Sequence, residues 1–177
     1  MKIAICDDDN SFLQNVKFLI NKIYSNPDKL SIYEYESGEQ FLLQFKPQFF
    51  DVIILDIEMC GITGLEVAEE IRKIDKSVIL AFLTSHQEFA TLGYEVNAFR
   101  YILKNQPEHM FINQLKSIFD EYHQSHITFP VQASNEIVNI LVSDILYFEI
   151  FKRTVVLHTI KKEYPVSYTH LRAHETE

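Results

Sequence analysis

Apolar runs in the first 105 residues are followed by polar side chains that could do chemistry. These side chains are Asp7, Asp8 and Asp9 after the first run, Asp56 after the third, Thr84 after the fourth and Lys104 after the fifth. Each has an ordinary explanation when taken alone, because an aspartate in such a place usually caps a helix or a turn, as we expect of Asp9. A threonine or a lysine there usually faces solvent. Their coincidence at four separate ends is what indicates a site.

The residue types in this group favour phosphoryl chemistry. Carboxylates placed close together repel one another, and their pKa values rise unless a cation lies among them. Mg²⁺ takes few protein carboxylates, keeps several waters and often completes its shell with phosphate oxygens. Lys104 and Thr84 would then bind phosphate oxygens as a point charge and a hydrogen-bond donor. Such a set favours attack by an aspartate on a phosphoryl donor and stabilises the resulting acyl phosphate.

The elements that must position these residues are short strands alternating with helices. Five apolar runs predict buried strands at Lys2–Cys6, Leu30–Tyr35, Asp51–Leu55, Val78–Leu83 and Ala98–Leu103. Three of them are nearly continuous in apolar residues, as expected when helices cover both faces of a parallel sheet. Spacings of three and four predict a helix that follows Asp9 and runs to Ile23. Further helices are predicted from a capping box at 37–40 through Phe45, over Leu65–Ile74, more weakly over His86–Tyr94, and from Pro107 to about Tyr122.

This alternation predicts an α/β fold with a doubly wound parallel sheet. Ligands of such sheets bind beyond the carboxyl ends of the strands, where the strand order reverses. The predicted site lies at those ends.

Four segments resemble the receiver family of two-component response regulators. They are IAICDDD (3–9), DVIILDIEMCGITGLEVAEEIR (51–72), ILAFLTSH (79–86) and NAFRYILKN (97–105). The resemblance covers residues 1–124 and implies a flavodoxin-like (βα)5 fold with strand order 2-1-3-4-5.

The resemblance also implies a role for each site residue. It makes Asp56 the phosphoacceptor. The ligands of a Mg²⁺ ion would be Asp8 directly, Asp7 largely through a water, Asp56, and the main-chain carbonyl of Glu58. Thr84 and Lys104 would bind the phosphoryl oxygens. Tyr101 falls at the switch-aromatic position, whose inward rotation would repack the face made by residues 86–94, 98–103 and the helix after Pro107.

Three further features concern the loops around Asp56. Gly61 and Gly64 frame a loop that must turn closely over the acceptor. Cys60 is expected to be a small, semi-buried residue rather than a reactive thiol. Asn105 stands where the family usually has proline after the lysine; because a non-proline cis bond costs about 3 kcal/mol, that turn is either trans or strained.

The bulk composition excludes several classes of protein. Hydrophobic residues make up 47% and charged residues 23%, which is typical of a globular chain. The triple aspartate interrupts what could be a signal peptide, no apolar run approaches the length of a membrane span, and two cysteines fit reduced thiols, so we expect a cytoplasmic protein without a membrane partner. Residues 1–125 hold 19 acidic against 11 basic residues and would repel nucleic acid.

From His126 the pattern changes to strands without helices. The stretch Val142–Thr159 resembles the start of a LytTR-type DNA-binding domain, so we expect a partial domain of this type over 125–166. Lys152 and Arg153 are candidate DNA contacts by that resemblance, or equally a polar hairpin turn. The family domain would need about twice these residues, and 167–177 resembles a translated adapter. We therefore expect an incomplete all-β segment and weak or absent DNA binding.

The interpretation favoured by these features is a phosphorylation-switched response regulator. A sensor histidine kinase would donate the phosphoryl group, Mg²⁺ would be required, the output would be transcription, and a homodimer could form on phosphorylation. It would not be a turnover enzyme, although receivers take part in their own phosphorylation and dephosphorylation. The alternatives are a phosphorylation-independent interaction module, which the complete residue set argues against, and a phosphohydrolase, for which Glu58 is the only local second acid.

Overall fold

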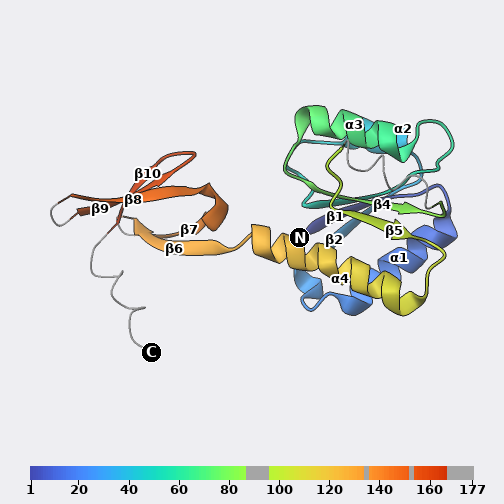
Figure 1. Cartoon of the computed structure of the whole chain (residues 1–177), viewed down its shortest axis with the longest axis horizontal. Coiled ribbons are helices and arrows are strands. Elements are labelled where there is room, and N and C mark those ends of the chain that lie inside the picture. Colours follow the sequence, from blue (N-terminus) through green and yellow to red (C-terminus); the bar gives the residue numbers. More distant parts are fainter. Residues whose placement is uncertain (87–95, 134–135, 152–153, 167–177) are drawn as a thin grey trace. The chain divides into compact units, whose positions relative to one another are not determined.

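The computed structural model describes residues 1–86, 96–133, 136–151 and 154–166 (Figure 1). All but His86 of the helix predicted over His86–Tyr94 lies outside the described residues, as do Lys152, Arg153 and the tail 167–177. The chain divides after Tyr122 into two compact units. None of the helices in the described ranges is long and apolar enough to cross a membrane.

The first unit is built on a five-stranded parallel sheet. Its strands are β1 (Lys2–Cys6), β2 (Ser31–Tyr35), β3 (Val52–Asp56), β4 (Ile79–Thr84) and β5 (Arg100–Leu103). Their order is β2-β1-β3-β4-β5, which confirms the predicted flavodoxin-like arrangement. Every residue of β3 and β4 is buried, as the nearly continuous apolar runs predicted.

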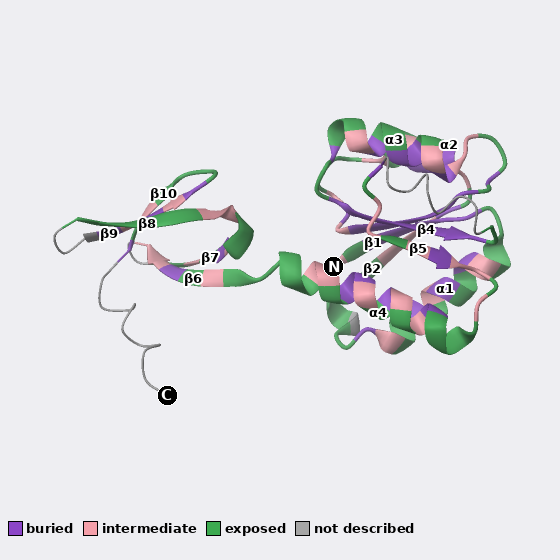
Figure 2. Cartoon of the chain, in the orientation of Figure 1, coloured by how far each residue is buried: buried purple, intermediate pink, exposed green. Residues whose placement is uncertain are grey.

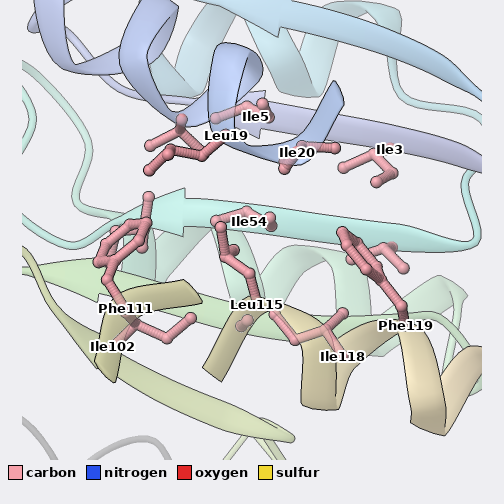
Figure 3. Close-up of a cluster of buried hydrophobic side chains, with 14 of the residues drawn as sticks. Ile3, Ile5, Leu19, Ile20, Ile54, Ile102, Phe111, Leu115, Ile118 and Phe119 are labelled. Atoms are coloured by element: carbon pink, nitrogen blue, oxygen red, sulfur yellow. The ribbon is translucent and has the colours of Figure 1, made fainter. Parts of the chain in front are cut away.

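Helices cover both faces of this sheet (Figure 1). The helices α2 (Gly38–Gln44) and α3 (Gly64–Ile74) lie on one face, and α1 (Asn10–Ile23) and α4 (Glu108–Ser125) lie on the other. Figure 3 shows side chains of α1 and α4 meeting those of the sheet, among them Leu19, Ile54 and Leu115. Each such buried side chain contributes roughly 1.5–3 kcal/mol. Two apolar layers therefore hold the strand ends in fixed positions.

The helix starts agree with the predictions at one place and differ at another. Asp9 caps α1, since its Oδ1 accepts the N–H groups of Ser11 and Phe12. The capping box predicted at 37–40 is wrong in its reciprocal half, because the Gln40 side chain accepts from Glu36 and not from Ser37. The reciprocal box lies at the start of α3.

In that box, the Thr63 hydroxyl accepts the Glu66 N–H while the Glu66 carboxylate accepts the Thr63 N–H.

The second unit is the predicted all-β segment. Its strands are β6 (Thr128–Ala133), β7 (Glu136–Leu141), β8 (Ile145–Phe151), β9 (Thr154–Thr159) and β10 (Glu163–Val166), in the antiparallel order β7-β6-β10-β9-β8. A small core gathers around Val131, Val155 and Leu157. Strand β8 is an edge strand and is coloured mostly as exposed in Figure 2. Its apolar side chains after Ile145, including Leu146 and Ile150, are exposed.

Candidate acidic site at the sheet edge

Strand register brings the predicted site residues to one edge of the sheet. Cys6 pairs with Leu55, so Asp7 and Asp56 begin the next step together on neighbouring strands. In the same way Asp56 pairs with Leu83, and Thr84 pairs with Leu103, which precedes Lys104. Residues from four sequence regions therefore meet at the carboxyl ends of β1, β3, β4 and β5.

A buried ion-pair cluster forms the centre of the site. The Lys104 Nζ atom lies 2.7 Å from Asp7 Oδ2 and 2.8 Å from Asp56 Oδ2. Asp7 is 0% and Asp56 4% exposed, and only 14% of the Lys104 side chain is exposed. Phe12 lies against the same ammonium, with its ring centroid 4.6 Å from Nζ. The lysine therefore bridges two carboxylates that have little contact with water.

Asp8 completes the acidic group from a more open position. Oxygen atoms of Asp7, Asp8 and Asp56 lie within 4.8 Å of one another, although Asp8 is exposed. The N–H of Cys60 donates to Asp8 Oδ2 at 2.9 Å. Three carboxylates thus face one small volume: those of Asp7 and Asp56 are buried, and that of Asp8 lies at the surface.

Burial and hydrogen bonding act in opposite directions on these carboxyls. Burial raises the pKa of both Asp7 and Asp56 above its ordinary value, and the nearby Lys104 ammonium offsets this only in part. The Cys60 N–H instead lowers the pKa of Asp8. Burial alone would lower the pKa of Lys104, but hydrogen bonds and attraction from Asp56 and Asp7 together raise it. Lys104 therefore stays protonated, but its single positive charge does not balance the two buried carboxylates.

A divalent cation would supply the positive charge that these carboxylates lack. Within the described part of the chain, Asp7 Oδ2 is a buried oxygen with an ion pair but no hydrogen bond of regular geometry. Carboxylate oxygens are the ligands that Mg²⁺ prefers, and a cation among them would remove their mutual repulsion. The residues present therefore suit Mg²⁺.

A second set of contacts lies beside the acidic group. Thr84 is buried, and its Oγ1 accepts the N–H of His86 at 3.1 Å. The Tyr101 hydroxyl donates to the carbonyl of His86, whose ring Nε2 lies 3.2 Å from Glu58 Oε2. His86 thus connects three of the predicted site residues. Sequence reasoning did not identify His86, since nothing in its spacing marks it.

Close packing over Asp56 explains the glycine at position 64. The Gly64 N–H donates to the Ile57 carbonyl at 3.0 Å, and a β-carbon added at Gly64 would lie 1.9 Å from the Asp56 carbonyl oxygen. Any larger residue would force the loop away from β3. The expected close turn of this loop over Asp56 is confirmed.

Two other loop expectations have definite outcomes. The peptide bond before Asn105 is trans, as are the others of the described ranges, and the Lys104 N–H donates to the Thr84 carbonyl at 2.7 Å. Lys104 therefore reaches the carboxylates without the usual proline. Cys60 is exposed rather than semi-buried, because its loop turns its main chain toward Asp8.

A known domain family matches most of the chain. The response regulator receiver domain matches residues 3–116, well over half of the chain. The chain belongs to this family. The receiver is thus part of a two-component phosphorelay. Receivers interact with sensor histidine kinases and bind Mg²⁺ at an acidic pocket. A response regulator of this family is not an enzyme of the usual kind.

Individual relatives support the same family. The sensory transduction protein LytR of Staphylococcus epidermidis is 27% identical over 191 residues, which cover 96% of this chain and 74% of LytR. The response regulatory domain of MrkE from Klebsiella pneumoniae is 29% identical, with a TM-score of 0.60, covering 70% of this chain and 99% of that one.

A third relative carries a bound ion. The response regulator TrrA from Thermotoga maritima, solved in complex with Mg²⁺–BeF, is 28% identical, with a TM-score of 0.54 and coverage of 66% of this chain and 97% of that one.

Proposed function

We propose that Asp56 is the phosphoacceptor of this receiver. The observation that carries the proposal is the buried Asp56 carboxylate, 2.8 Å from Lys104 Nζ and grouped with Asp7 and Asp8. An oxygen of Asp56 would attack the phosphorus of the donor, the bond to the leaving group would break, and an acyl phosphate would remain. Lys104 and Thr84 would then bind the phosphoryl oxygens.

Mg²⁺ belongs to the same proposal. Asp7, Asp8 and Asp56 would hold it, together with the main-chain carbonyl of Glu58, and when bound it would neutralise charge on the phosphoryl group. The buried, incompletely satisfied Asp7 Oδ2 and the acidic group around it support this assignment.

The switch would act through Thr84 and Tyr101. Both are connected to His86, one to its N–H and the other to its carbonyl. Drawing the Thr84 hydroxyl toward a phosphoryl group would break its bond with the His86 N–H. The main chain of His86 would then shift and release Tyr101, which could rotate inward and repack the surface beside β5.

A mass measurement tests the phosphoacceptor. With acetyl phosphate and Mg²⁺, the wild-type chain is expected to gain one phosphoryl group by intact mass, and Asp56→Asn is expected to gain none, because an amide is a poor nucleophile. Asp28→Asn, at an exposed aspartate, is the matched control and should be modified like the wild type.

Two outcomes would contradict the proposal. Phosphate release over many turnovers would indicate a phosphohydrolase. A wild-type chain that never forms the adduct would indicate a phosphorylation-independent interaction module.

The second unit extends the proposal to the output. We propose a receiver at 1–124, a partial LytTR-type domain at 125–166 and a tail at 167–177 outside both, in a cytoplasmic regulator of transcription that dimerises on phosphorylation. The match to LytR over both units and the all-β sheet support this. Lys152 and Arg153 remain candidate DNA contacts.

DNA binding by this chain is expected to be weak. Its β unit has a small core and an exposed apolar edge at β8, and the chain carries a net charge of −9. In a mobility-shift titration we expect no sequence-selective complex below roughly 1 µM, the range of non-specific affinities. A selective nanomolar complex would contradict this.

A further inference from the structure

The loop between β3 and α3 is held between carboxylates from two other elements. The Cys60 N–H donates to Asp8 Oδ2 at 2.9 Å, and the Ile62 N–H donates to Glu39 Oε1 at 3.0 Å. Only Gly61 lies between the two donors. Asp8 follows β1, whereas Glu39 belongs to the first turn of α2. The loop is thus fixed at two points that are two residues apart.

Gly61 makes this double attachment possible and also necessary. Its φ of +89° lies in the left-handed region, which side-chain-bearing residues rarely adopt. A β-carbon added there would lie 2.2 Å from Glu39 Oε1, so the main chain passes directly against that carboxylate. Because glycine has many accessible conformations, the loop needs an outside contact to keep this one.

Glu39 is well placed to supply that contact. Its neighbour Gly38 packs so tightly that an added β-carbon would lie 2.6 Å from the Val67 side chain and 2.7 Å from that of Ile62. The start of α2 is therefore fixed against the loop and α3. Backbone N–H groups, its own and that of Ile62, hold the pKa of Glu39 below its ordinary value, so the side chain is an ionised acceptor at neutral pH.

We propose that Glu39 is a positioning residue for the cation site. By accepting the Ile62 N–H, it holds the loop so that the Cys60 N–H orients Asp8, and it thereby strengthens divalent-cation binding without touching the cation. The inference rests on the proposed Mg²⁺ site. Partners of this outer kind commonly change metal affinity by 10–100-fold.

Magnesium titration of the full chain tests the proposal. Following amide shifts by NMR, we expect Glu39→Ala to weaken Mg²⁺ binding about tenfold. Glu39→Gln should bind nearly as the wild type does, because its amide oxygen can still accept the Ile62 N–H. Glu36→Ala is the matched control: it removes an exposed charge close to the same helix start while leaving the Glu36 N–H bonded to Gln40.

A double-mutant cycle sharpens the test. Gly61→Ala should also weaken binding, since its β-carbon would displace the Glu39 carboxylate. Combined with Glu39→Ala it should cost less than the sum of the single losses, because the clash is then gone.

Three results would overturn the inference. They are a Glu39→Ala variant with wild-type affinity, a Glu39→Gln variant as weak as Glu39→Ala, which would point to charge alone, and strictly additive losses in the cycle. A wild-type chain that binds no Mg²⁺ would instead remove the proposed function itself, and this inference with it.

Discussion

Lys104→Met is expected to destabilise the receiver by about 3 kcal/mol at pH 7 without Mg²⁺ and to abolish phosphorylation. Methionine keeps much of the volume but removes the ammonium that lies 2.7 Å from Asp7 and 2.8 Å from Asp56. Breaking a buried ion pair on one side leaves an uncompensated charge, which costs about 3–5 kcal/mol. Here two buried carboxylates lose their partner at once.

The pH dependence of this loss follows from the pKa shifts. Lys104 has a raised pKa, so the stability from its pairing is fully present below its ordinary pKa of 10.5 and is lost as pH rises through the raised value. In the variant, the cost arises only when Asp7 and Asp56 are ionised. It should therefore be large at pH 7 and shrink as these carboxyls take up protons at acidic pH.

Urea denaturation at pH 7 and at acidic pH measures how much Lys104→Met lowers the free energy of unfolding. Lys116→Met, at an exposed lysine of α4, is the control and should change the free energy of unfolding by less than about 0.5 kcal/mol. If Lys104→Met were as stable as the wild type at pH 7 without Mg²⁺, the buried pairs would have no energetic role.

Stabilisation by Mg²⁺ is expected to increase with pH. For a carboxyl whose pKa is raised on folding, the stability contribution is fully present below the ordinary value of 3.8 and is lost as pH rises through the raised value. Asp7 and Asp56 both behave in this way. Without Mg²⁺ they oppose folding at neutral pH, and a bound cation would remove that opposition.

Competition between protons and the cation sets the size of the effect. While one of these carboxyls is protonated, apparent Mg²⁺ affinity should rise by up to about tenfold per pH unit and then level off above the raised pKa. At a concentration of one hundred times Kd, Mg²⁺ would stabilise the fold by about 2.7 kcal/mol.

Thermal unfolding with and without Mg²⁺ from acidic to neutral pH checks this. The difference in Tm should widen with pH in the wild type and in the exposed-residue control Asp120→Asn. It should nearly disappear in Asp8→Asn, which lacks one carboxylate. A difference that is constant or falls with pH would argue against cation binding by Asp7 and Asp56.

Strand-end residues could be predicted from sequence because strand periodicity determines them. The buried runs of β3 and β4 end at Asp56 and Thr84, and parallel pairing then aligns the two ends. The connection rules for parallel strands allow few other strand orders in a doubly wound sheet, so these ends come close together. The composition of the acidic group followed directly from these ends.

Loop contacts could not be predicted in this way. Glu39 meets Ile62, and Glu58 meets His86, across elements that only the folded chain brings together. The exposure of Cys60 depends on the same loop. The capping box is different, since Thr63 and Glu66 have the expected spacing just as Ser37 and Gln40 do, and the sequence pattern alone could not choose between the two.

Because β1, β3, β4 and β5 pair in parallel register, the positions of the residues at the strand ends depend on the strands and not on the length of the connections between them. An extra residue in a surface connection would cost little, because the entropy of closing a loop grows slowly with its length. An extra residue inside β3 would turn the Asp56 side chain to the opposite face of the sheet. Natural variation in length should therefore be found in the connections, while the strands leading to the acidic edge keep their length.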